Sequence, residues 1–218
     1  MIKHFAKYIP NELKDMSGSV FYSGENGFKG KKALYILGLN PGGSDIAQKS
    51  ETIEWHTQNL LKNESRDFSE YKDGQWRGKE KGTYGLQPRV LHLIDSLGLN
   101  PYEIPASNVC FVRSPRESDI ADKLKGYMDL CWVFHQQVID QLGIKTILCF
   151  GKTAGKYVKK QLGANVLIDE FVERNNRKWR TQVFRNKLEQ NVIIASHPSI
   201  ADWTNEKTDI SDLVKKYV

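Results

Sequence analysis

Short apolar runs alternate along this chain with longer segments in which apolar residues recur at helical spacing. The apolar runs show no polar alternation, which is typical of strands buried on both faces of a sheet. They are short and contain β-branched and aromatic residues, which also favours strands. We therefore predict strands at 33–37, 107–113, 146–151 and 191–195.

Helical periodicity fills the spaces between these strands. We expect helices at about 86–97, 119–142, 152–162 and 208–218, and a hairpin between Val166 and Val183. A glycine follows each of the first three, at Gly98, Gly143 and Gly163, where a helix commonly ends. Helices that alternate with strands predict an α/β fold: a three-layer sandwich with a central four-stranded parallel sheet flanked by helices.

Polar side chains follow the first and the last predicted strand. Asn40 stands in Gly38-Leu39-Asn40-Pro41-Gly42-Gly43-Ser44, and His197 stands in Ser196-His197-Pro198-Ser199. In open α/β sheets, ligands bind at the carboxyl ends of the strands, and glycines let a backbone approach a ligand closely. A turn that merely needs glycines would explain the first stretch alone. The second stretch, at 196–199, carries a histidine at the end of another strand, and this favours a ligand site over a simple turn.

Two further residues are candidates for that site. Asn108 opens the second apolar run, and a buried amide there must find hydrogen-bond partners; the simpler interpretation is a cap or a turn. Tyr84 precedes a helix and stands between Gly82 and Gly85. The pattern alone is equally compatible with ordinary packing of the tyrosine and with a role in binding.

Long polar segments surround these motifs. Residues 1–32 are basic and rich in turns, and nothing in them indicates chemistry. Residues 45–81 are too long for a simple connection, so we expect an insertion with one or two helices that serves as a lid or a partner surface. His56 within it is expected to be a solvated surface residue, and His135 is expected to be structural.

Positive charge is concentrated in one part of the chain. The formal net charge is +6, whereas residues 151–187 alone contain ten Lys or Arg and three Asp or Glu. Arg177, Lys178 and Arg180 surround Trp179 there. A solvated face is the usual explanation of such a run, but cations interleaved with an aromatic residue also suit a nucleic-acid groove.

Composition narrows the remaining possibilities. The length of 218 residues suits one domain spanning 1–218, and neither a membrane-spanning run nor a signal peptide is expected, which favours the cytoplasm. Cys110, Cys131 and Cys149 form no C-x-x-C pair, so buried free thiols are expected rather than disulfides or a metal site. Gly151-Lys152-Thr153 lacks the first glycine of a phosphate-binding loop, which argues against a nucleotide triphosphatase.

Four motifs together resemble the uracil-DNA glycosylase superfamily. They are G-L-N-P-G at 38–42, N-V-x-x-x-R at 108–113, L-C-F-G at 148–151 and S-H-P-S at 196–199, in the order of that family. Two departures stand out. Of the four cysteines of the iron-sulfur branch, only Cys131 resembles a remaining ligand, since Val112 stands at the place on the second strand and the paired N-terminal cysteines are missing. The first motif carries Asn40, as in the mismatch-specific and single-strand-selective branches, instead of an aspartate. Because an amide is not a strong base, a slower or differently selective enzyme is expected.

The resemblance implies a hydrolase of base excision repair with a uracil-DNA glycosylase-like fold. It would act as a monomer, without a cofactor, on single- or double-stranded DNA that contains uracil or a related base, which it would flip out of the stack. The implied catalytic residues are Asn40, which positions water, and His197, which hydrogen-bonds to the departing base. The base-binding residues would be Gly38, Leu39, Tyr84 and Asn108, and the DNA-binding residues Gly42, Gly43, Ser199, Arg177, Lys178 and Arg180. Ile200 could wedge into the vacated stack, although core packing is the simpler expectation for it.

Two other functions remain open from the sequence. One is a noncatalytic nucleic-acid-binding module that keeps the fold and the basic face. The other is an unrelated α/β hydrolase that acts on a small nucleoside.

Overall fold

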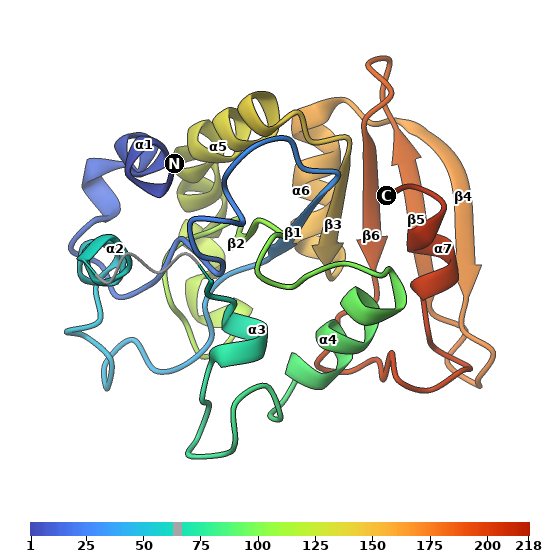
Figure 1. Cartoon of the computed structure of the whole chain (residues 1–218), viewed down its shortest axis with the longest axis horizontal. Helices are drawn as coiled ribbons and strands as arrows, with labels where there is room; N and C mark the ends of the chain where they lie inside the picture. The colour runs from blue at the N-terminus through green and yellow to red at the C-terminus, as the bar shows by residue number, and fades with distance from the viewer. Residues whose placement is uncertain (63–66) are drawn as a thin grey trace.

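The computed structural model describes residues 1–62 and 67–218, which form an α/β fold built on one mixed six-stranded sheet (Figure 1). The strand order is β2-β1-β3-β6-β5-β4. The strands are β1 (Leu34–Gly38), β2 (Ala106–Asn108), β3 (Thr146–Phe150), β4 (Val166–Val172), β5 (Arg180–Arg185) and β6 (Asn191–Ala195). The predicted α/β class is confirmed.

The sheet is larger than the sequence led us to expect. Pairing is parallel from β2 through β1 and β3 to β6. The predicted hairpin, β4 and β5, then joins the edge of β6 in antiparallel orientation and extends the sheet. The sheet is therefore mixed, and β5 provides hydrogen-bond partners for the edge of β6 that would otherwise be unpaired.

Helices cover both faces of the sheet. They are α1 (Ile2–Phe5), α2 (Ile53–Lys62), α3 (Glu70–Asp73), α4 (Gln87–Ser96), α5 (Ala121–Leu142), α6 (Lys152–Leu162) and α7 (Ser211–Lys215), with short 3₁₀ turns at Ala6–Tyr8, Asn11–Leu13 and Glu117–Ile120. Tyr35 and Leu37 of β1 pack in one core with α5 and α6. Leu34 and Ile36 pack in a second core with α4 and α7, which lie on the near side of the sheet in Figure 1. Successive side chains of a strand thus serve opposite layers.

The second strand ends earlier than predicted. The strand register with β1 ends at Asn108, opposite Gly38, and only the Val109 and Cys110 amides still donate to the Gly38 and Leu39 carbonyls. Beyond it the chain turns to the N-terminal segment, where the Ser19 amide donates to the Phe111 carbonyl and Gly18 bridges to Val112. Asn108 therefore lies at the carboxyl end of β2, whereas the sequence placed it at the head of a strand.

The insertion at 45–81 forms α2 and α3, and its residues 63–66 lie outside the described part of the chain. The three cysteines are free and buried, as predicted, and burial raises the pKa of Cys110 to about 11. His135 is fully buried and its Nδ1 lies 2.9 Å from the Tyr35 hydroxyl, which agrees with a structural role. Within the described ranges, no helix has both the length and the apolarity to cross a membrane.

Candidate active site

One cavity of about 800 Å³ opens at the carboxyl ends of β1, β2, β3 and β6. Asn40, Asn108 and His197, which are far apart in the sequence, line it together. They meet because parallel strands place their carboxyl ends at the same edge of a sheet. Of the other predicted site residues, this cavity also contacts Gly38, Leu39, Gly42, Ser199 and Arg180.

The Asn40 side chain has a fixed orientation. Its Nδ2 donates to the Pro41 carbonyl at 3.0 Å and the Ser114 hydroxyl at 3.0 Å, with the Val112 carbonyl at 3.4 Å. The Ser114 hydroxyl donates its own hydrogen to the Arg116 carbonyl, so it must accept from Asn40. The amide nitrogen is thereby identified, and Oδ1 is left as the acceptor for a molecule in the cavity.

The Asn108 side chain is buried with one hydrogen-bonding group unused. Its exposure is 5%, and its Nδ2 has no partner among the described residues. An unpaired buried donor is costly, and a ligand in the cavity would satisfy it. Gly38 makes this placement possible, since a Cβ at position 38 would lie 2.2 Å from Asn108 Oδ1.

His197 is held as a hydrogen-bond donor toward the cavity. The Ser199 backbone amide donates to its Nδ1 at 3.1 Å, and the Ser199 hydroxyl lies 2.7 Å from the same atom. A backbone N–H can only donate, so Nδ1 accepts and the neutral ring carries its hydrogen on Nε2. Burial lowers the pKa of His197, which favours this neutral form.

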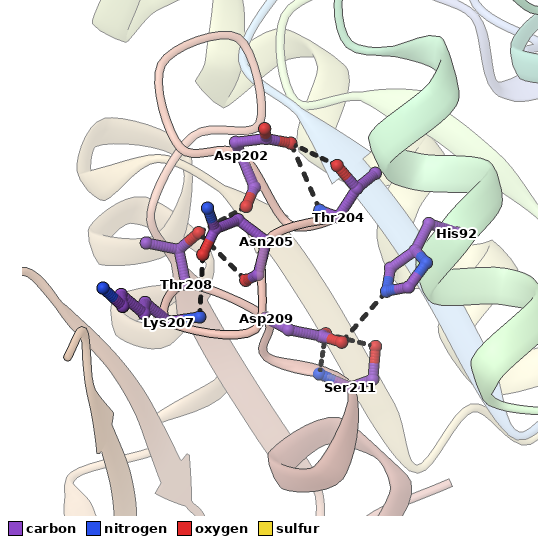
Figure 2. Close-up of polar contacts among 8 residues, drawn as sticks. All are labelled: His92, Asp202, Thr204, Asn205, Lys207, Thr208, Asp209 and Ser211. Carbon is purple, nitrogen blue, oxygen red and sulfur yellow. Dashed lines mark hydrogen bonds and ion pairs between the residues drawn. The ribbon is translucent and has the colours of Figure 1, made fainter. Parts of the chain in front are cut away.

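Helix α4 anchors the turn that carries His197. Arg89 donates to the Pro198 carbonyl and pairs with Asp202 at 3.4 Å. One turn further along α4, His92 Nε2 lies 2.9 Å from Asp209 (Figure 2). Figure 2 also shows Asp209 accepting from Ser211. Arg89 and His92 of α4 therefore both hold the loop that follows His197.

Arg89→Ala is expected to loosen this turn. The amides of Ile200 and Ala201, which donate to the His197 carbonyl, should exchange their hydrogens roughly tenfold faster, because one charge-assisted hydrogen bond is lost. Hydrogen exchange followed by NMR or mass spectrometry measures this. His92→Ala is the matched control and should speed exchange near Asp209 instead. Unchanged protection of both amides in Arg89→Ala would show that the turn is stable without the Arg89 contacts.

The predicted basic residues differ in what they contact. Arg177 donates to the Ile200 carbonyl at 2.7 Å, pairs with the buried Glu173 at 3.0 Å and stacks on Trp179 at 4.2 Å from the ring centroid. Arg180 is exposed and pairs with Glu170. Lys178 lies in the turn between β4 and β5, with a φ of 52° and no ion pair within the described part of the chain. Arg177 is thus a structural residue as well as a cation.

Tyr84 does not line the first cavity. It lines a second, adjoining cavity, together with Gly43. The aromatic side chains at the first cavity include Tyr22, Tyr71 and Trp76. Trp76 is fixed by Glu70, whose Oε1 accepts from the indole Nε1 at 2.5 Å.

The sequence did not predict Tyr22, Tyr71 and Trp76 as site residues. The expectations for His56 and Ile200 were wrong. Tyr22 comes from the N-terminal segment, and Tyr71 and Trp76 come from the insertion; their aromatic character was the only signal. His56 is half-buried in the second cavity, where burial and then Arg113 lower its pKa to about 4, so the expectation of a solvated residue is wrong. Ile200 is 57% exposed at the rim of the first cavity, which excludes core packing.

The comparisons with known proteins identify no relative of this chain. No protein-family model matches the chain, and no curated protein matches it.

Proposed function

We propose that this protein is a DNA glycosylase that hydrolyses the bond between deoxyribose and uracil or a related base. The observation that carries this proposal is the convergence of Asn40, Asn108 and His197 on one cavity, each with a hydrogen-bonding group left for a ligand. The uracil-DNA glycosylase-like fold belongs to the same proposal. The parallel arrangement of β2, β1, β3 and β6 supports it.

Asn40 would position the attacking water. Its Oδ1 accepts a hydrogen bond from water and so turns an oxygen lone pair toward the sugar C1′. Glycosidic bonds break through a transition state in which the sugar carries positive charge, so the attacking water needs orientation more than early deprotonation. The oxygen of water ends on C1′, and the departing base gains a hydrogen. A neutral amide is adequate for this role.

His197 would stabilise the departing base. Negative charge develops on a base carbonyl oxygen as the bond breaks, and the Nε2–H of a neutral imidazole can donate to that oxygen. Such a donor is most effective when it is fixed in advance in a site shielded from water. The two contacts from Ser199 to Nδ1 provide this fixation.

Asn108 would recognise the base. Its free Nδ2 is a donor for a carbonyl oxygen on the hydrogen-bonding edge of a flipped base. Leu39 lines the same cavity beside it. Tyr22 contributes a hydroxyl whose pKa is raised by burial and then by Glu70. The amide and the phenol form the polar end of the base site.

The rim of the cavity suits an extruded nucleotide. Ile200 is exposed beside the His197 turn, where an apolar side chain can fill the gap that a flipped base leaves. Ser199 and the glycines at 42 and 43 are exposed and can approach phosphates closely.

The test is direct. The protein is incubated with single- and double-stranded oligonucleotides that contain one uracil, and alkali-labile abasic sites are measured. Strand breaks at the uracil after alkali support the proposal. Binding without breaks would identify a noncatalytic nucleic-acid-binding module, and release of uracil only from free nucleosides would identify a small-molecule hydrolase.

Neutralising the exposed cations near the cavity is expected to weaken DNA binding at every sequence. Lys178→Gln and Arg180→Gln together should flatten the slope of log K against log salt by up to about one unit for each lost phosphate contact. Fluorescence anisotropy at several salt concentrations measures the slope.

The control for that experiment is Lys125→Gln, which removes an exposed cation on α5 outside both cavities. Arg177 is left intact because its loss would leave the buried Glu173 carboxylate without its cation. Equal slopes for the double variant and the control would mean that this part of the hairpin is only a solvated face.

A further inference from the structure

The second cavity adjoins the first. It measures about 720 Å³ and shares Tyr22, Gly42 and Trp76 with the first cavity. The two cavities therefore meet at the turn that follows Asn40.

That turn presents open backbone donors. Within the described residues, the amides of Gly42, Gly43 and Ser44 donate to no acceptor. Arg113 holds the turn in place: it donates to the Gly42 carbonyl at 2.8 Å and the Ser17 hydroxyl at 3.1 Å, and pairs with Glu51 at 3.2 Å. Successive free N–H groups beside a guanidinium form a site for an anionic oxygen.

Inside the second cavity, aromatic faces lie beside unused polar groups. Tyr84 lines this cavity and not the first, and Trp76 lines both. Among the described residues, only Trp76 hydrogen-bonds to the Glu70 carboxyl, so the second carboxyl oxygen is open. His56 Nδ1 is buried and also has no described partner. Aromatic faces combined with edge-on hydrogen-bonding groups are how proteins bind unpaired bases.

We propose that the second cavity binds the nucleotide next to the excised one in a single strand, and that it prefers a base with an exocyclic amino group. Consecutive nucleotides are joined by one phosphate, and Gly42 borders both cavities. A phosphate on the 42–44 amides would therefore place one nucleoside in each cavity. Tyr84 would stack on the second base and Glu70 would accept from its amino group. In a duplex this neighbour is paired and stacked, so the site requires an unpaired strand.

This inference rests on the proposed function, but its test does not require turnover. The probe is a single-stranded oligonucleotide with a non-cleavable abasic analogue and 2-aminopurine, a fluorescent base with an amino group, on its 5′ or 3′ side. Wild-type protein should quench the fluorescence on one side only. Tyr84→Ala should lose the quenching and bind roughly tenfold more weakly, because one stacked base is lost. Tyr84→Phe keeps the ring and should behave as wild type.

Glu70→Gln tests the amino preference separately. Glutamine keeps an oxygen for Trp76 and adds an NH₂ group that can donate to a thymine carbonyl. Wild type should bind oligonucleotides with adenine or cytosine at the neighbouring position several-fold more tightly than those with thymine, and the variant should lose that difference. Equal affinity of the wild type for all neighbours, or quenching that survives in Tyr84→Ala, would overturn the inference. Neighbour-dependent binding without excision of uracil would refute the glycosylase proposal and leave the nucleotide site standing.

Discussion

Asn40→Ala and His197→Ala are each expected to slow single-turnover excision of uracil by roughly two to three orders of magnitude, with little change in DNA affinity. Under the proposed function, both side chains would act mainly in the transition state, Asn40 on the water and His197 on the departing base. Because they act as a unit, the double variant should be far less impaired than the product of the single effects. Quenched-flow measurement of abasic sites gives the rates.

Thermal unfolding distinguishes this result from loss of structure. Asn40 also ties its turn to Ser114, so the melting temperature of each variant must accompany its rate. His197→Gln offers a second check, since it keeps a side-chain donor at this position. If the two residues only secured their turns, the melting temperature would fall and activity would be lost in proportion to unfolding. Full-rate excision by both well-folded single variants would end the glycosylase assignment of this cavity.

The His197 site also predicts a pH dependence. Burial holds its pKa below the ordinary value of 6.5, so the ring stays neutral as the pH falls to 6.5 and below, down to that lowered pKa. Protonation then places a hydrogen on Nδ1 against the Ser199 amide, which cannot accept it. Excision should therefore persist through the ordinary histidine range and decline only below it.

Asn108→Ala is expected to slow excision roughly ten- to a hundredfold while affinity for uracil-free DNA stays the same. Under the proposed function, the lost hydrogen bond would join the protein only to the flipped base, and a polar base edge would be left unpaired in a buried site. Single-turnover rates and anisotropy titrations separate the two quantities. Gly38→Ala should produce a similar loss from the other side, because its Cβ would displace the Asn108 amide.

Ser107→Ala is the control on the same strand. Its hydroxyl donates to the Val20 carbonyl at 2.6 Å in the core, away from the cavity, so its loss should lower stability and spare excision by the folded fraction. Wild-type excision by Asn108→Ala would show that the amide is structural and that another group reads the base.

Strand-end residues were the part of the site that the sequence could predict. Asn40 and His197 follow apolar runs, and the geometry of a parallel sheet brings such positions to one edge whatever lies between them. The burial of Cys110 and Cys149 followed from the other two apolar runs, 107–113 and 146–151. Asn108 was identified for its polarity, although its strand ends at that residue and does not begin there.

The walls of the cavities were beyond prediction for a physical reason. Tyr22 and Trp76 lie in segments without strand or helix periodicity, so no repeating pattern marks which way their side chains point. Their placement depends on long-range contacts, such as that of Trp76 with Glu70. His56 lies on the short helix α2, and the sequence does not show that this histidine faces the second cavity near Arg113.

The position of β6 has a consequence for how the protein folds during its synthesis. It is the last strand in the chain, yet it lies inside the sheet between β3 and β5. While the chain emerges from the ribosome, β2, β1 and β3 can pair early, but the β4–β5 hairpin has no place to dock until β6 follows. His197 emerges two residues after β6 ends, so the cavity that Asn40 and Asn108 line lacks its histidine until then. The cavity is therefore completed in one late step of synthesis, and any activity that needs His197 must follow that step.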